Sequence, residues 1–187
     1  RIAAAQDGDT VSFAAGISSI TLIQRRIRVE HAVSIIGPGS SALAITTDWA
    51  PGGYEAFLFT YQGRGDVVIS GLSLSKNQIH VRSMVGKLTI EDVRISGSTA
   101  AYGGALYVGN DGDVEITNSH FEGNTGTRNA GAVYIYNTGK ATISGSTFVG
   151  NTTSGLGGAI YIGTEAGTAG DLELFDDGGA VAVVRLP

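Results

Sequence analysis

The sequence predicts an all-β fold, a right-handed parallel β-helix made of stacked coils of about 21–27 residues. The first observation is a motif that recurs about every 27 residues, with Gly104, Gly131 and Gly158 in equivalent positions. The second is that apolar residues alternate along each copy and align between copies, which is typical of strands with one buried face. The third is the length of each coil, which is too short for a strand–helix–strand unit of roughly 30 residues or more. Parallel crossovers are right-handed in about 98% of cases, so a right-handed coil is expected.

The repeated motif has two parts. Residues 103–108 read GGALYV and return as AGAVYI at 130–135 and as GGAIYI at 157–162. The segment between the copies also repeats, since ITNSHFEGN at 116–124 aligns with ISGSTFVGN at 143–151. The spacing of the copies varies, so insertions are expected in the turns rather than in the strands.

Alternation along the strands predicts which side chains form the core. Three columns are apolar in every copy, and we expect them to point inward. They are Val67, Leu88, Val114 and Ala141; Ile69, Ile90, Ile116 and Ile143; and Leu74, Ile95, Phe121 and Phe148. The column between the first two is mixed in character, so it is expected to face water.

Two turns in each coil repeat their own residue types. A bend is expected after the second core column, at residues that tolerate left-handed backbone angles. These are Gly71, Asp92, Asn118 and Gly145. At another turn Asn77, Asn124 and Asn151 recur, and their stacked side chains are expected to hydrogen-bond between coils.

We expect a single domain over residues 1–187, because the chain has the length of one domain and the repeat extends along it. Residues 1–16 are expected to form an N-terminal cap, with a short helix, and the first strand. Residues 66–162 hold the clearest repeats, and residues 163–187 are expected to be a degenerate last coil. No cap is evident after that coil, so further chain or a partner is expected to cover its open edge.

The composition excludes several classes of function. The chain has no Cys, and its three His residues are scattered without the spacing of metal ligands. The net charge of -5 argues against binding a nucleic acid. No apolar run approaches the roughly 20 residues of a membrane helix. We therefore expect no metal, no cofactor, no nucleic-acid partner and no transmembrane segment.

The two parts of the motif resemble the repeats of polymorphic outer membrane proteins, in which Gly-Gly-Ala-(Ile/Leu/Val) is paired with Phe-x-x-Asn. The matching residues are 103–106, 157–160, Phe121 with Asn124, and Phe148 with Asn151. The second copy departs from the pattern, with Ala130 in place of the first Gly. The N-terminal part, from residues 7–11 through residues 35–39, resembles the opening of many bacterial right-handed β-helix repeat proteins.

This resemblance implies a secreted or surface-displayed β-helix associated with the bacterial outer membrane. Such proteins are often autotransporter passengers with adhesin or structural roles. The implied partner is a glycan or a host-surface protein. The favoured hypothesis is therefore a non-enzymatic scaffold that presents its faces and loops for adhesion.

One column of tyrosines is a candidate ligand-binding site. Tyr107, Tyr134 and Tyr161 follow the inward position in three successive copies, so we expect them to point outward. Rings one strand spacing apart, about 4.8 Å, suit stacking on sugar rings or an adhesive stripe. The alternative is that the rings only stack on one another and stabilise the sheet.

A charged group on neighbouring coils is the candidate catalytic site of an alternative reading, a polysaccharide lyase or glycoside hydrolase on a β-helix. Its residues are Glu91, Asp92, Arg94, Glu115 and His120. Hydrolysis needs two carboxylates roughly 5–10 Å apart, and Glu91 with Glu115 are candidates as diagonal neighbours. The simpler reading of these side chains is a solvated face with ordinary ion pairs.

Overall fold

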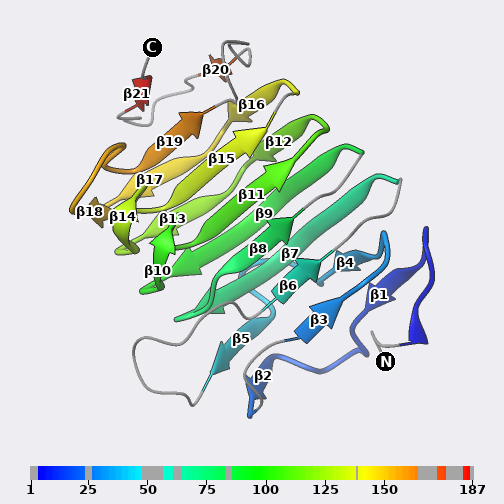
Figure 1. The fold of residues 1–187 in the computed structure, drawn as a ribbon. Coiled ribbons are helices and arrows are strands. Elements are labelled where there is room, and N and C mark those ends of the chain that lie inside the picture. The colour runs from blue at the N-terminus through cyan, green and yellow to red at the C-terminus, as the bar shows by residue number, and fades with distance from the viewer. Residues whose placement is uncertain are drawn as a thin grey trace.

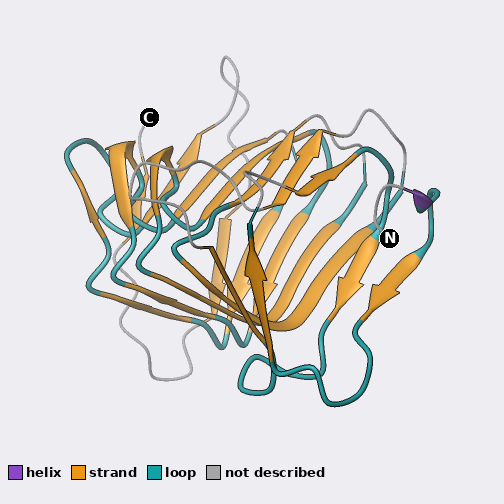
Figure 2. Cartoon of the chain, turned by 90° about the horizontal axis from the view of Figure 1, so that it is seen from below, coloured by secondary structure: helices purple, strands orange, loops and turns teal. Residues whose placement is uncertain are grey.

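A computed structural model shows the chain as a stack of parallel coils, which confirms the predicted all-β architecture (Figure 1). The structure describes residues 4–23, 27–47, 57–60, 65–82, 86–137, 139–163, 172–175 and 183–185. Within these ranges every strand pair is parallel, and three sheets run along the stack. Helical geometry among them is confined to Ala4, next to the N-terminus (Figure 2).

The first sheet takes one or two strands from each coil. Its main path runs in the order β1-β4-β7-β9-β12-β16-β20, with β2, β5, β13 and β17 attached. The strands are β1 (Thr10–Ser12), β2 (Ser19–Leu22), β4 (Ser34–Ile36), β5 (Ala44–Thr47), β7 (Val67–Ser75), β9 (Leu88–Ser96), β12 (Val114–Thr117), β13 (His120–Glu122), β16 (Ala141–Ser144), β17 (Thr147–Val149) and β20 (Leu172–Phe175).

The second and third sheets complete the coils. The second sheet contains β3 (Ile27–Val29), β6 (Phe57–Thr60), β8 (Ile79–Arg82), β11 (Leu106–Asn110), β15 (Val133–Asn137), β19 (Ile160–Gly163) and β21 (Val183–Arg185). The third is shorter and contains β10 (Thr99–Tyr102), β14 (Thr125–Asn129) and β18 (Thr152–Thr153). Because each strand pairs with its equivalent in the next coil, any residue type that repeats in the sequence becomes a column along the stack.

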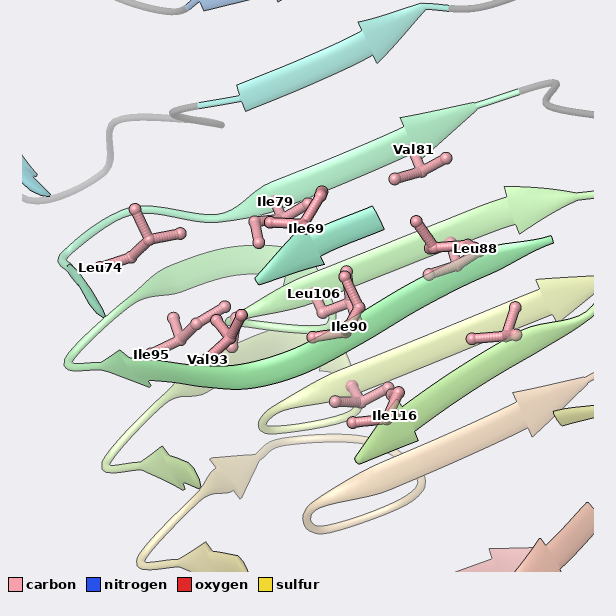
Figure 3. Packing of buried hydrophobic residues seen from close by; sticks show 14 of the residues in the cluster. Ile69, Leu74, Ile79, Val81, Leu88, Ile90, Val93, Ile95, Leu106 and Ile116 are labelled. Atoms are coloured by element: carbon pink, nitrogen blue, oxygen red, sulfur yellow. The ribbon is translucent and has the colours of Figure 1, made fainter. Parts of the chain in front are cut away.

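The core lies between the sheets, as the alternation predicts. The first two apolar columns are all at most 2% exposed, and Ile69, Ile90 and Ile116 are fully buried. Figure 3 shows the side chains of Ile69, Ile90 and Ile116. They point into the same interior as those of Ile79 and Leu106, from the second sheet. The third column is buried as far as Phe121, which stacks on the half-buried Phe148 at a centroid distance of 4.9 Å.

The predicted bend is confirmed by the backbone. Its four residues all have positive φ angles. The angles are 65° at Gly71, 47° at Asp92, 50° at Asn118 and 55° at Gly145. This left-handed turn lets β7 and β9 change direction without breaking the register of the following core column.

Asn side chains join the coils at the second repeated turn. Asn124 is fully buried, and its amide donates to Asn151 Oδ1 at 2.9 Å and to the carbonyl of Ile95 at 3.0 Å. The side-chain oxygen of Asn124, Oδ1, accepts from the backbone N–H of Ser98 at 3.0 Å. The Ser98 hydroxyl donates to the backbone carbonyl of Asn77 at 2.8 Å. The predicted Asn ladder is confirmed between Asn124 and Asn151. Ser98 occupies the coil in which the sequence has no Asn, and the Asn77 side chain donates within its own coil, to the carbonyl of Ser75 at 2.9 Å.

The Gly-Gly motif has two different physical causes. The first position has a positive φ in every copy, 56° at Gly103, 57° at Ala130 and 72° at Gly157, so Ala130 adopts a conformation that suits Gly better. The second position lies against the next coil. A Cβ added at Gly104 would lie 2.4 Å from the carbonyl oxygen of Gly131, which is far inside van der Waals contact.

The coils are not all within the expected 21–27 residues. Val68 hydrogen-bonds to Ser34, 34 residues earlier, whereas the following coils advance by 21, 26 and 27 residues. Part of the extra length is the connection between β4 and β5. In the next coil both strands pair with the continuous strand β7, which contains no such connection. The strands keep their pairing because this insertion lies outside them.

The two ends of the chain extend the same stack. In the N-terminal segment, Ala5 is buried against the core and the backbone N–H of Gly8 donates to the carbonyl of Ala32 at 2.8 Å. Beyond residue 163, β20 pairs with β16 in the first sheet and β21 pairs with β19 in the second. Residues 1–3 of the expected cap and most of 164–187 lie outside the described residues.

Candidate functional site

The outward side of the second sheet carries a stacked row of aromatic rings. Tyr107, Tyr134 and Tyr161 pair in register, and the residue before each of them is buried in the core. Ring centroids are 5.4 Å apart between the first two and 4.7 Å apart between the last two, with interplanar angles of 7° and 4°. His80, in the preceding coil, stacks on Tyr107 at 4.3 Å. We call the three tyrosines the tyrosine ladder.

Mutual stacking decides which parts of the rings can meet a ligand. Tyr134 has a tyrosine on each side, so both of its ring faces are covered. Glycines two residues further on give the outer rings room, since a Cβ added at Gly109 would lie 3.2 Å from the Tyr107 ring, and one at Gly163 would lie 2.8 Å from the Tyr161 ring. The rings therefore lie along their strands. A sugar at Tyr134 would meet ring edges and hydroxyl groups instead of an open ring face.

Two arginines contact the aromatic cluster, which consists of the tyrosine ladder, His80 and Tyr102. Tyr102 packs at a tilt on Tyr134, with ring centroids 5.1 Å apart. The guanidinium of Arg128 lies over the Tyr102 ring at 5.6 Å and donates to its hydroxyl at 3.1 Å. In the coil before Tyr107, Arg82 Nε donates to His80 Nε2 at 2.7 Å. Both arginines are exposed, so the ladder and its neighbours form one cationic and aromatic surface.

The tyrosine ladder is expected to make the fold sensitive to alkaline pH. Burial raises the pKa of Tyr134 to about 12, with Tyr161 and Tyr107 adding to the shift. A tyrosine in an unfolded chain ionises at about pH 10. Between these values the folded chain keeps a proton that the unfolded chain has lost, so the free energy of unfolding falls as pH rises from about 10 to about 12. Urea denaturation across this interval measures the decline.

The matched variant for this prediction is Tyr134→Phe, which keeps the ring and removes the ionising group. Its free energy of unfolding is expected to fall less steeply over the same pH interval than that of the original chain. Equal slopes in the two proteins would contradict the assignment of the alkaline transition to Tyr134.

Asp92, one of the candidate catalytic residues, has a structural contact. Its carboxylate accepts hydrogen bonds from the backbone N–H of Ser40 at 3.0 Å and from the Ser40 hydroxyl at 2.5 Å. The two residues are 52 positions apart in the chain. Since both carboxylate oxygens are engaged, Asp92 anchors the connection between β4 and β5 to the bend of β9.

The two candidate glutamates lie on the outward side of the first sheet. Glu115 pairs with Thr89 and Glu91 pairs with Thr117, so the glutamates are diagonal neighbours, as expected. Glu115 Oε2 lies 2.5 Å from Lys87 Nζ. The hydrogen bond with Glu115 raises the pKa of Lys87 above its usual range. The Glu115 carboxylate is therefore held in a surface ion pair.

His120 and Arg94 are neighbours across the same sheet. They pair in register, as the columns predicted. The Nδ1 of His120 contacts the hydroxyl of Thr147 in the next coil, and its Nε2 lies 3.4 Å from Glu122. Arg94 is exposed. Glu91, Asp92, Arg94, Glu115 and His120 are thus brought to one sheet, where the contacts of Asp92, Glu115 and His120 run to Ser40, Lys87 and Thr147.

Sequence reasoning missed the other members of the aromatic cluster. His80 precedes Tyr107 by 27 residues, the same step that separates Tyr107 from Tyr134, so the repeat itself signals its place in the column. No comparable signal exists for Tyr102 and Arg128. The register between β10 and β14 shifts between Ala100 and Tyr102, so this pair cannot be found by counting residues.

Within the described ranges no three His, Cys, Asp or Glu side chains gather closely enough to hold a metal ion. In the same part of the chain, no helix combines the length and the apolar character that a membrane crossing needs.

The fold and its columns of repeated side chains define a parallel β-solenoid. The chain belongs to the family described as right handed beta helix region, whose model matches residues 15–169. This match agrees with the handedness that the sequence predicts. Comparisons with curated proteins and with solved structures gave no match.

Proposed function

We propose that this chain is a non-enzymatic scaffold of a secreted or surface-displayed protein, and that its role is adhesion to a glycan or a host-surface protein. The family match supports the rigid β-helix part of this proposal. The association with the bacterial outer membrane and the passenger role rest on the motif resemblance described above.

The observation that carries the proposal is the engagement of two of the three candidate catalytic carboxylates. Asp92 accepts two hydrogen bonds from Ser40, and Glu115 is paired with Lys87. A general acid or nucleophile must instead point at the substrate with a pKa suited to proton transfer or attack. Contacts that hold neighbouring coils together fit a scaffold better than a catalytic centre.

A second candidate function is a carbohydrate-binding module, and the tyrosine ladder favours it. The three rings are in register along the stack, and their hydroxyl groups can donate and accept hydrogen bonds. A sugar-binding face is compatible with a scaffold, because it needs no cleavage chemistry. A lyase or hydrolase, by contrast, would cleave the sugar that it binds.

Prolonged incubation with a panel of polysaccharides, followed by product analysis, tests the proposal. The purified chain is expected to release no reducing ends and no unsaturated sugars above a boiled control. Cleavage by the original chain that is lost in Glu115→Gln or Glu91→Gln would overturn it and assign the first sheet a hydrolytic or lyase role. Arg28→Gln, at an exposed ion pair on the second sheet, is the control variant.

A further inference from the structure

The charges of the molecule are separated between its sheets. The strands of the first sheet contain four carboxylates whose side chains the structure describes, from Glu91, Asp92, Glu115 and Glu122. The cations beside them are Arg94 and Lys87, which precedes β9 and pairs with Glu115. The strands of the second and third sheets contain no Asp or Glu. The net charge of -5 does not reveal this separation, because it sums the strands that contain carboxylates with the described strands that contain none.

The second and third sheets, whose described strands contain no Asp or Glu, bear the tyrosine ladder and its aromatic neighbours. Arg82 and Arg128 are exposed there, and each contacts a ring of the aromatic cluster. The nearest acidic residues along the chain are Glu30 and Asp111, which lie beyond the ends of β3 and β11. Glu30 Oε1 lies 3.1 Å from Arg28 Nε, so that carboxylate is offset by a cation of the same face.

From this arrangement we infer that the tyrosine ladder, with Arg82 and Arg128, binds an acidic polysaccharide. The inference rests on the proposed adhesive function and names its ligand class. Local potential depends on the nearby charges, so an anionic ligand is attracted to this face although the whole chain is acidic. The first sheet, with its excess of carboxylates, repels the same ligand and leaves one face for binding.

The geometry favours a linear sugar polymer over other anions. The ladder repeats the same phenol group along the stack at centroid distances of 5.4 and 4.7 Å, which suits a ligand that also repeats its groups along a line. Ring edges and hydroxyl groups offer hydrogen bonds to sugar hydroxyls. A guanidinium forms bidentate hydrogen bonds with carboxylate or sulfate groups. Arg82 lies beside His80, in the coil before Tyr107, and Arg128 lies beside Tyr102, which packs on Tyr134. Both guanidinium groups therefore border the row of rings.

Binding to matched polysaccharides tests the inference. Polygalacturonate is compared with its methyl ester, and dextran sulfate with dextran, so each pair differs in charge on one backbone. The acidic member of at least one pair is expected to bind 10-fold or more tightly than its neutral partner, and this preference is expected to decline with added salt. Which pair responds distinguishes carboxylate from sulfate. Equal binding within both pairs, or no binding to any of the four, would overturn the inference.

Variants locate the binding surface. The double variant Arg82→Gln/Arg128→Gln is expected to lose 10-fold or more in affinity for the acidic polymer, while Arg82→Lys/Arg128→Lys keeps part of it. Arg94→Gln, an exposed arginine of the first sheet, is the matched control and is expected to bind like the original chain. Thermal unfolding confirms that each variant is folded. An equal loss in Arg94→Gln would contradict the assignment to the second sheet.

Two further outcomes separate this inference from the proposed function. Poly-glutamate that binds as tightly as the acidic polysaccharide would overturn the inference in favour of an acidic protein ligand, and it would leave the adhesive scaffold standing. Cleavage of any of the four polymers would overturn the proposed function itself.

Discussion

Replacement of Ile116 by Asp is expected to unfold several coils of the β-helix together. Ile116 is fully buried in the second core column, between Ile90 and Ile143 of the neighbouring coils. The substitution removes a packed side chain and places an unpaired carboxylate in the core, so the expected loss in free energy of unfolding exceeds about 4 kcal/mol. Because each coil is stabilised by its neighbours, the damage spreads beyond the substituted strand.

Urea denaturation followed by circular dichroism measures this loss. Ser144→Asp is the control, because it introduces the same charge at a half-buried position next to the inward-facing Ile143. The control is expected to unfold at nearly the same urea concentration as the original chain. An unchanged midpoint in Ile116→Asp would show that this column does not face the core.

A second large effect is expected from a single methyl group at Gly104. Its Cβ would lie 2.4 Å from the carbonyl oxygen of Gly131 and 2.7 Å from backbone atoms of Thr125, so two coils must move apart. Overpacking of this kind destabilises proteins by about 1–3 kcal/mol, and backbone atoms on both sides favour the upper end of that range. Gly104→Ala is thus expected to lower the free energy of unfolding by about 3 kcal/mol.

The repeat supplies a second position for the same test. Gly131 holds the same place in the next copy of the motif, and a Cβ added there would lie 2.2 Å from the carbonyl oxygen of Gly158. Gly131→Ala is therefore expected to lower the free energy of unfolding by about as much as Gly104→Ala. Thermal unfolding of both variants tests this expectation. A midpoint like that of the original chain in either variant would contradict the close approach of the coils.

The fold was accessible from the sequence because a solenoid repeats its physical requirements in every coil. A core residue such as Ile90 has a counterpart in the same column before and after it, so alternation and repeat period give the same answer. Gly71 and Asn118 likewise reveal the bend, since both tolerate a positive φ. Coil length was less predictable. The insertion between β4 and β5 has no counterpart in the later coils from which the period was read.

The candidate sites were predictable only in part, for the same reason. Tyr107, Tyr134 and Tyr161 repeat, so their column and its outward direction follow from the period. Whether their rings face a ligand or one another depends on packing, which the period does not describe. A contact that occurs only once in the molecule could not be predicted from the repeat. The bond between Asp92 and Ser40 joins residues 52 positions apart, and no repeat points to it.

The central claim is that the molecule binds through the aromatic face of the second sheet and cleaves nothing. A glycan-array screen with product analysis tests it most directly, using the original chain, the Tyr107/Tyr134/Tyr161→Ala triple variant and Glu91→Gln/Glu115→Gln. The corresponding triple Phe variant keeps the stacked rings and separates loss of hydroxyl groups from loss of packing. We expect glycan binding that disappears in the folded triple Ala variant, persists in the Gln variant and yields no cleavage products. Binding lost in the Gln variant instead, or released products, would contradict the account.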